Sequence, residues 1–295
     1  ISLGLVGSEM CIRDRYKNSR FTATASLLGT YITDKVEQGE KPDDKRRLSP
    51  AVSLSWRPFS ESTLRIRASY KDIFRVPTFT DLYYLRMGNT NLKPEETSQY
   101  NVGVTWSSSC GDWLRHFSIS ADGYYNTVKD KIVALPTMYV WKMMNMGEVD
   151  IKGVDVNLST QFRLPLRMSL LLASTYSFQY AVDVTDPEAK NYKDQIPYTP
   201  RHSGTVSVTL ENPWVNVSYI LTAVGDRYAL PQNIDRNRID SYIEQSISIN
   251  RDFRFRYFGL RLQGELLNLA NVNYDVIQYY PMPGRSWRLS ICLSY

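Results

Sequence analysis

The sequence predicts an all-β protein, a transmembrane antiparallel β-barrel, and three observations carry this prediction. Apolar and polar residues alternate along most of the chain, which is typical of strands whose two faces meet different surroundings. The segments between these strands alternate in length, a long one after each short one. Aromatic residues flank the short segments, where the interface of a membrane is expected.

Composition excludes two other classes of protein. The 295 residues are 43% hydrophobic and 22% charged, and their mean hydropathy is -0.35. No apolar run approaches the roughly 18 residues that a membrane-spanning helix needs, so the chain is not a helical membrane protein. The 21 Tyr, 10 Phe and 6 Trp are spread along the chain, which argues against disorder.

The charge, cysteine and histidine content indicates no catalytic, metal-binding or nucleic-acid-binding site. The net charge of +5 comes from scattered residues and includes no basic tract typical of nucleic-acid binding. Cys11, Cys110 and Cys292 lie far apart and indicate neither a zinc site nor a disulfide framework. His116 and His202 are the only histidines, and no catalytic triad, phosphate-binding glycine loop or metalloprotease motif accompanies them. We therefore expect neither an enzyme nor a bound cofactor or metal.

The strands follow from the alternation. Between residues 63 and 70, for example, Leu64, Ile66 and Ala68 lie on one face and Arg65 and Arg67 on the other. The same pattern predicts twelve strands, near residues 20–33, 48–57, 63–73, 94–106, 114–133, 148–162, 166–182, 201–211, 214–226, 238–251, 256–269 and 285–295. The expected long connections are 34–47, 74–93, 134–147, 183–200, 227–237 and 270–284; the short ones are 58–62, 107–113, 163–165, 212–213 and 252–255.

The alternating connections favour a membrane barrel over a soluble β-protein. A sandwich or propeller has no reason to keep its long loops at one end, whereas outer-membrane barrels have short periplasmic turns and long extracellular loops. In lipid, only helices and closed barrels satisfy every backbone hydrogen bond. An aromatic girdle is expected at the short turns, formed by Trp56, Phe59, Trp106, Trp113, Trp214, Phe253 and Phe255.

The first fifteen residues do not fit the rest of the chain. The segment 1–15, ISLGLVGSEMCIRDR, resembles the translated adapter read-through found at the ends of some proteins from environmental sequencing. We therefore expect residues 1–15 to be non-native and residues 16–295 to be the barrel portion. The alternative is that residues 1–15 are the end of a native strand.

Several motifs, in this order from about residue 49 onward, resemble the C-terminal part of a TonB-dependent outer-membrane receptor barrel. The stretch YKDIFRVPT at 70–78 is similar to a family signature, and GNTNLKPE at 88–95 is similar to another. Later matches are NMG at 145–147 with KGVD at 152–155, IPYTPRH at 196–202 and an NL…Y…PGR ending. The residues that carry the resemblance are Phe74, Arg75, Pro77, Asn89, Asn91, Leu92, Pro94, Glu95, Asn268, Tyr274, Gly284, Arg285 and the terminal Tyr295.

The resemblance implies a transporter without bond-making chemistry. Receptors of this family sit in the outer membrane of Gram-negative bacteria, and their barrels have 22 strands. Twelve strands would be the C-terminal half, with the C-terminus at the periplasmic end and the plug domain and TonB-contact segment missing. The implied partners are outer-membrane lipid, the chain's own plug, the TonB complex through the missing N-terminal region, and the barrel-assembly machinery through Tyr295.

The resemblance implies active uptake of a scarce ligand through the loops. Two roles are open for Arg75: contact with the plug from the barrel lumen, or pairing with a lumenal carboxylate. Residues 78–88 contain no His, which makes haem less favoured than a ferric siderophore or cobalamin, and glycans also rank lower. Aromatic and basic loop residues suit a flat or anionic ligand; the candidates are Tyr83, Tyr84, Arg86, Tyr139, Trp141, Lys142, Arg227 and Tyr228. Packing of these residues between loops is the alternative for each of them.

Two competing functions remain at this stage. A passive porin-like barrel without TonB coupling would lack the upstream plug domain. A soluble all-β enzyme or adhesin would bury alternate strand faces against each other and would not partition into detergent.

Overall fold

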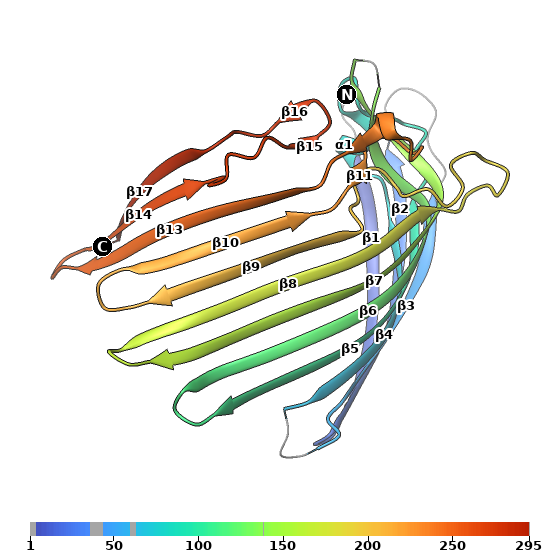
Figure 1. Ribbon diagram of the computed structural model, residues 1–295. Coiled ribbons are helices and arrows are strands. Elements are labelled where there is room, and N and C mark those ends of the chain that lie inside the picture. Colours follow the sequence, from blue (N-terminus) through green and yellow to red (C-terminus); the bar gives the residue numbers. More distant parts are fainter. Residues whose placement is uncertain (1–3, 36–43, 60–62, 138, 295) are drawn as a thin grey trace. The chain divides into compact units, whose positions relative to one another are not determined.

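The computed structural model describes residues 4–35, 44–59, 63–137 and 139–294, and nearly all of their regular structure is β-strand (Figure 1). Within these residues, thirteen strands form one sheet in the order β1-β2-β3-β4-β5-β6-β7-β8-β9-β10-β13-β14-β17. The strands are β1 Gly4–Lys17, β2 Phe21–Lys35, β3 Lys45–Trp56, β4 Arg65–Arg75, β5 Glu95–Cys110, β6 Leu114–Pro136, β7 Trp141–Leu164, β8 Met168–Asp183, β9 His202–Glu211, β10 Asn216–Val224, β13 Tyr242–Arg254, β14 Gly259–Leu267 and β17 Ser286–Ser294.

The remaining elements are short and lie in the long connections. They are α1 Phe79–Tyr83, β11 Arg227–Tyr228, the 3-10 helix Asp235–Asn237, β12 Arg238–Ile239, β15 Asp275–Ile277 and β16 Tyr280–Pro281. In Figure 1, α1 lies at the end of β4 and β5, and β15 and β16 lie at the end of β14 and β17. Among the described residues, no helix has the length and apolar character needed to span a membrane.

The twelve strands expected from the alternation are all present. One expected connection is wrong in extent: β6 continues to Pro136 and β7 begins at Trp141, so the long loop expected at 134–147 is a short connection. Mixed polar and aromatic residues there hide the alternation, and the two strands continue because they pair with each other.

Residues 4–15 of the segment that the sequence sets apart lie in β1, Gly4–Lys17. It pairs with β2 residue by residue, from Gly4 opposite Lys35 to Lys17 opposite Thr22. Asp14 lies opposite Ala25, on the face where Ile12 lies opposite Leu27. A non-native origin of residues 1–15 stays a prediction.

The chain divides into two compact units, which are described separately. Unit 1 is Ile1–Val104, Tyr124–Ile151 and Val184–Pro187; unit 2 is Thr105–Gly123, Lys152–Asp183 and Glu188–Tyr295. In unit 1, Leu54 of β3 lies between Ala23 of β2 and Ala68 of β4 on the apolar face. On the other face, Ser53 lies between Thr24 and Ser69. Strict alternation therefore gives this part of the sheet one apolar face and one polar face.

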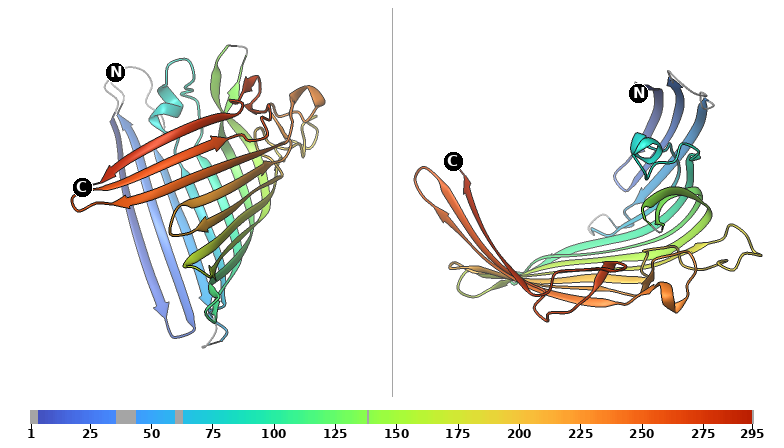
Figure 2. Two further views of the ribbon diagram at one scale, coloured as in Figure 1. Left: turned by 60° about the vertical axis from the view of Figure 1, so that its left-hand side comes forward. Right: turned by 90° about the horizontal axis from the view of Figure 1, so that it is seen from above.

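Unit 2 shows the same separation, with β13, β14 and β17 running side by side in both views of Figure 2. On the apolar face of β17, Trp287, Leu289, Ile291 and Leu293 are 79%, 65%, 63% and 64% exposed. On the polar face, Arg288 of β17 pairs with Glu265 of β14. Arg261 of β14 donates two hydrogen bonds to Asp252 of β13 across 2.6 and 3.0 Å. An apolar face left open on this scale suits lipid, whereas a soluble sandwich would cover it.

The buried apolar residues gather near the long connections. In unit 1 they include Leu92, Val128 and Val149, and in unit 2 they include Ala181, Val182, Ile196, Ala229 and Ile239. At the short turns, by contrast, Trp56, Phe59, Trp106, Trp113, Trp214 and Phe255 are exposed. Buried apolar side chains therefore lie near the long connections in each unit, and exposed aromatic rings lie near the short turns.

Candidate functional site

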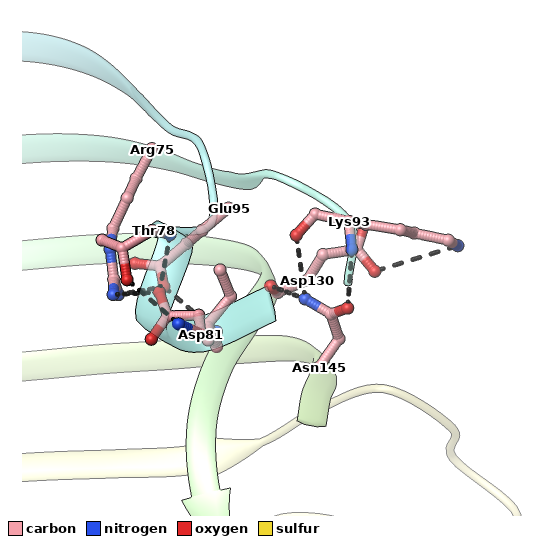
Figure 3. Close-up of polar contacts among 8 residues, drawn as sticks. Arg75, Thr78, Asp81, Lys93, Glu95, Asp130 and Asn145 are labelled. Atoms are coloured by element: carbon pink, nitrogen blue, oxygen red, sulfur yellow. Dashed lines mark hydrogen bonds and ion pairs between the residues drawn. The ribbon is translucent and has the colours of Figure 1, made fainter. Parts of the chain in front are cut away.

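The connection after β4 begins with a capped turn of helix. Thr78 is the N-cap of α1: its hydroxyl accepts a hydrogen bond from the backbone N–H of Asp81 at 3.2 Å. The Asp81 carboxylate accepts one in return from the backbone N–H of Thr78 at 2.9 Å. This reciprocal capping box satisfies two amide groups that the helix cannot pair itself. It fixes the direction in which the chain leaves β4 (Figure 3).

Arg75 ties this turn to β5. Its guanidinium lies 3.3 Å from Asp81 and 3.5 Å from Glu95, and Glu95 also accepts a hydrogen bond from the backbone N–H of Ile132 at 3.1 Å. Of the two roles open for Arg75, pairing with a carboxylate is therefore the one present here. Because Arg75 is 45% exposed, water screens these pairs, and their main effect is to fix geometry.

Asn145 of β7 fastens the end of the same connection. Its side chain accepts a hydrogen bond from the backbone N–H of Lys93 at 2.8 Å and donates to the carbonyls of Lys93 at 3.1 Å and Asp130 at 2.7 Å. The Lys93 ammonium lies 3.9 Å from the Asp130 carboxylate (Figure 3). One amide thus links three segments that are far apart in sequence.

The GNTNLKPE motif holds the connection through a close backbone approach at Gly88, the side-chain amide of Asn89 and the buried side chain of Leu92. At Gly88, a Cβ atom would lie only 2.6 Å from the carbonyl oxygen of Leu82, so no larger residue fits without moving the backbone. Asn89 donates to the carbonyl of Met143 at 3.1 Å and accepts from the N–H of Asn91 at 3.0 Å. Leu92 is buried. Phe74 is half-buried at the end of β4, Pro77 is fully buried at the start of the connection, and Pro94 is half-buried at its end.

The ligand candidates of unit 1 divide into exposed and packed residues. Tyr84, Arg86 and Tyr139 are exposed in connections. Tyr83 is half-buried in α1, with its ring 5.0 Å from that of Phe79. Trp141 and Lys142, expected in a loop, lie in strand β7.

Arg227, a ligand candidate of unit 2, is instead packed. It is 3% exposed, and its guanidinium donates to the backbone carbonyls of Asp275 and of Val276, the latter at 3.3 Å. It also lies over the ring of Tyr242, 5.5 Å from the centroid. Tyr228 is half-buried, and its carbonyl accepts from the N–H of Tyr198 at 2.7 Å. Burial raises the pKa of the Tyr198 phenol.

A second amide cluster joins the connection after β8 to the one after β10. Asn233 accepts from the backbone N–H of Gln195 at 2.6 Å and donates to the carbonyl of Gln195 at 3.0 Å. The backbone N–H of Asn233 donates to the Asp194 carboxylate at 3.0 Å. Gln195 in turn accepts from Arg201 at 3.1 Å. Residues of the three long connections in unit 2 thus hold one another.

Tyr274 fixes the last connection on the sheet. Its ring stacks on that of Tyr242 with centroids 4.1 Å apart, and its hydroxyl donates to Glu244 at 3.2 Å. Burial, with the negative charge of Glu244 beside it, raises the pKa of Tyr274 to about 12. The phenol therefore stays protonated and donating at neutral pH.

The final motif closes this connection on itself. Asn268 is 3% exposed and donates to the carbonyls of Val272 at 2.8 Å and Pro283 at 3.2 Å. Arg285 donates to the carbonyl of Leu269 at 2.9 Å. At Gly284, a Cβ atom would lie 2.8 Å from the side-chain oxygen of Asn271, which already accepts from the N–H of Arg285. Tyr295 lies outside the described residues.

Comparison with known proteins identifies the family. The family model described as "TonB dependent receptor-like, beta-barrel" matches residues 11–269. The chain belongs to this family. The match begins inside the segment 1–15 that the sequence analysis set apart.

Relatives and solved structures place the chain within the TonB-dependent receptors. It is 27% identical over 236 residues to the vitamin B12 transporter BtuB of Photobacterium profundum, covering 77% of this chain and 34% of the relative. It is 24% identical over 221 residues to BtuB of Vibrio vulnificus, covering 72% and 32%. The unliganded structure of the ferric citrate transporter FecA matches with a TM-score of 0.74 at 12% identity, covering 99% of this chain and 45% of FecA. The chain thus spans about a third of the length of the vitamin B12 transporters that it matches.

For a TonB-dependent receptor barrel, the two sets of motif residues have a local structural explanation. Arg75, Asn89 and Glu95 hold the connection after β4, and Asn268, Tyr274 and Arg285 hold the one after β14. Sequence reasoning did not select Asp81, Asn145 or Asn233 as site residues. The Thr78-x-x-Asp81 spacing is a capping-box signal that could have revealed Asp81. Asn145 lies in the NMG match at 145–147, but its partners and those of Asn233 are distant in sequence, so no local pattern reveals these contacts.

Two of the cavities among the described residues lie in unit 2. One of about 260 Å³ lies along β7–β10, where Asp155, Thr175, Ser177, Ser203, Thr205 and Thr222 contribute polar groups. The other, of about 360 Å³, lies between two long connections of unit 2. Among the described residues, no three His, Cys, Asp or Glu side chains are grouped closely enough to hold a metal ion.

Proposed function

We propose that this chain is the C-terminal part of the barrel of an outer-membrane receptor that takes up a scarce ligand actively, with energy from TonB. The observation that carries the proposal is the family match over residues 11–269. The open apolar face of β17 and the exposed aromatics at the short turns support a position in the outer membrane. The C-terminus is proposed to lie at the periplasmic end, because the short turns belong on that side.

Cobalamin is the favoured ligand, and a ferric siderophore is the second candidate. The two vitamin B12 transporters cover most of this chain, whereas the iron transporter shares the fold at only 12% identity. The proposed contacts are the exposed loop residues Tyr84, Arg86 and Tyr139, with Tyr83 at the edge of α1. Arg227 is proposed to position the loops rather than to touch the ligand, because its guanidinium is bonded to backbone carbonyls.

The remaining partners belong to the whole receptor. A plug domain encoded upstream would fill the barrel and carry the TonB contact, and Tyr295 would direct the chain to the barrel-assembly machinery. Loss of Tyr295 should reduce insertion into the outer membrane while leaving transcription unchanged. These partners follow from the family, because the chain spans only about a third of its relatives.

The test is ligand uptake by the receptor expressed from its complete gene. In cells without a cobalamin receptor of their own, labelled cyanocobalamin should accumulate when TonB is present and should not when TonB is deleted. The double variant Tyr83→Ala and Arg86→Ala should take up less at the same surface abundance. Uptake that is independent of TonB would instead identify a passive, porin-like barrel and contradict the proposal.

A further inference from the structure

The larger cavity of unit 2 lies between the connection before β13 and the connection before β17. Segments 236–241 and 273–279 form its walls, and its volume is about 360 Å³. This volume is at the lower end of the range for sites that take small molecules, so a larger ligand would place only some of its groups there.

The walls of the cavity are fixed before any ligand arrives. The Gln278 side-chain amide donates to the carbonyl of Arg236 at 3.1 Å, which links one wall to the other. The backbone N–H of Tyr279 donates to the Asp275 carboxylate at 3.0 Å. Behind this wall, buried Arg227 holds the carbonyls of Asp275 and Val276. A prearranged wall lowers the entropic cost of binding, because fewer groups must become ordered.

Several groups that line the cavity are available to a ligand. Among the described residues, the guanidinium of Arg236 and the side-chain amide of Asn273 have no hydrogen-bond or ion-pair partner. Within the part of the chain that the structure describes, the Asp240 carboxylate pairs with Arg238 alone, at 3.5 Å. The ring of Tyr279 is 79% exposed at the rim. The cavity therefore offers a cation, an amide, a carboxylate and an aromatic face together.

The charges of the lining balance. Its ionisable side chains of opposite sign are Arg236 and Arg238 against Asp240 and Asp275. An anionic chelate would gain from the arginines and be repelled by the carboxylates. A primary carboxamide needs both a donor for its carbonyl and an acceptor for its NH₂ group. Arg236 or Asn273 can supply the first, and Asp240 or Asp275 the second.

We propose that this cavity is a subsite for carboxamide groups of a neutral ligand, with the exposed ring of Tyr279 against the ligand's flat surface. The inference rests on the proposed uptake function and specifies its substrate class. Cobalamin fits this class, because primary carboxamides surround the edge of its flat corrin ring.

The experiment measures cyanocobalamin binding to the full-length receptor in detergent, where TonB is not needed. Arg236→Gln removes the free cation, and Tyr279→Ala removes the rim aromatic. The matched controls are Arg256→Gln and Tyr257→Ala at the short turn after β13, where Tyr257 is also 79% exposed. Each cavity variant should raise the Kd about tenfold, the size expected for loss of one hydrogen bond or ring contact, and each control should leave it unchanged.

Two outcomes would overturn the inference, and each differs from a failure of the uptake proposal. Equal affinity of the cavity variants and the controls for cyanocobalamin would place the ligand elsewhere, while TonB-dependent uptake still holds. Binding of ferric citrate and not cyanocobalamin by the unchanged receptor would contradict a neutral, amide-bearing substrate class. The substituted side chains lie at the surface, so every variant is expected to fold. Heat-modifiable migration of each variant checks that its barrel is folded.

Discussion

Single side chains fix the long connections of this barrel onto its strands. Asn145 is the clearest case in unit 1, because its one amide bonds the backbone of both Lys93 and Asp130. An Asn in a strand is otherwise unfavourable. Asn145 occupies this position because its side chain forms hydrogen bonds with the backbone of Lys93 and Asp130.

Replacing Asn145 with Ala should loosen the connection after β4 without unfolding the sheet. The substitution removes hydrogen bonds to the exposed backbone of Lys93 and to the part-buried carbonyl of Asp130. Each such bond contributes about 0.5–1.5 kcal/mol, because water can replace the lost partner. Hydrogen exchange of residues 76–94 should become faster. Asn157→Ala is the control, because that side chain makes a single long contact of 3.4 Å with Ser120. Equal exchange in the two variants would contradict the role given to Asn145.

Tyr274 predicts a pH dependence at high pH. Its pKa is about 12 in the folded chain and about 10 in an unfolded one, so the folded state keeps the proton longer. The stabilising contribution is complete below pH 10 and is lost as the pH rises towards 12. The free energy of unfolding should therefore fall between these values, and less steeply in Tyr274→Phe. A Glu244→Gln variant should shift the loss to lower pH, and identical curves for all three proteins would refute this explanation.

At the level of elements, each strand separates an apolar face from a polar face. On β17, Ile291 lies opposite Leu262, while its neighbour Ser290 lies opposite Gln263. Adjacent residues of one strand thus face two different surroundings. This makes β17 suitable for a paired test of which face meets lipid.

Lysine at the two positions should have opposite consequences. Ile291→Lys places a charge on the lipid face and should destabilise the inserted barrel by about 2–4 kcal/mol if the site lies near the middle of the bilayer. Ser290→Lys places it on the polar face and should have little effect. The fraction of folded full-length receptor, followed by heat-modifiable migration in increasing urea, gives both values. A larger loss for Ser290→Lys would reverse the assignment of the faces.

At the level of the whole molecule, outer-membrane location is the central prediction. The full-length receptor should fractionate with the outer membrane, need detergent for extraction and migrate differently on a gel before and after heating. Those properties follow from the apolar strand face that stays open in unit 2. A protein that is monomeric and soluble without detergent would contradict the membrane assignment.

The complete gene should also encode a plug domain before residue 16. The residues that match the vitamin B12 transporters make up only about a third of those proteins. We therefore expect further strands and the plug to precede this part of the barrel. Sequencing across the upstream region would test this. A start codon and signal peptide directly before residue 16 would support a smaller, self-contained pore instead.

The strands could be predicted from the sequence because alternation is a local property. Leu289, Ile291 and Leu293 indicate their face without reference to any partner. The hydrogen bond from Arg227 to the carbonyl of Asp275 joins residues 48 positions apart, and no sequence pattern around Arg227 reveals it. The sequence therefore suggested Arg227 as a ligand contact, whereas in the structure its side chain is buried and bonded to the backbone of Asp275 and Val276. Strands β6 and β7 also extend beyond their expected ends because of a non-local contact. They pair with each other, and this pairing stabilises residues whose alternation is weak.

The linked connections of unit 2 have a consequence for protein engineering. Asn233 bonds Gln195 and Asp194, while Gln278 bonds the carbonyl of Arg236. Grafting a single loop from another receptor would break bonds in the two loops that remain. Residues 188–201, 225–241 and 268–285 are therefore best exchanged together, as one cassette, when a chimeric receptor with a new ligand preference is built.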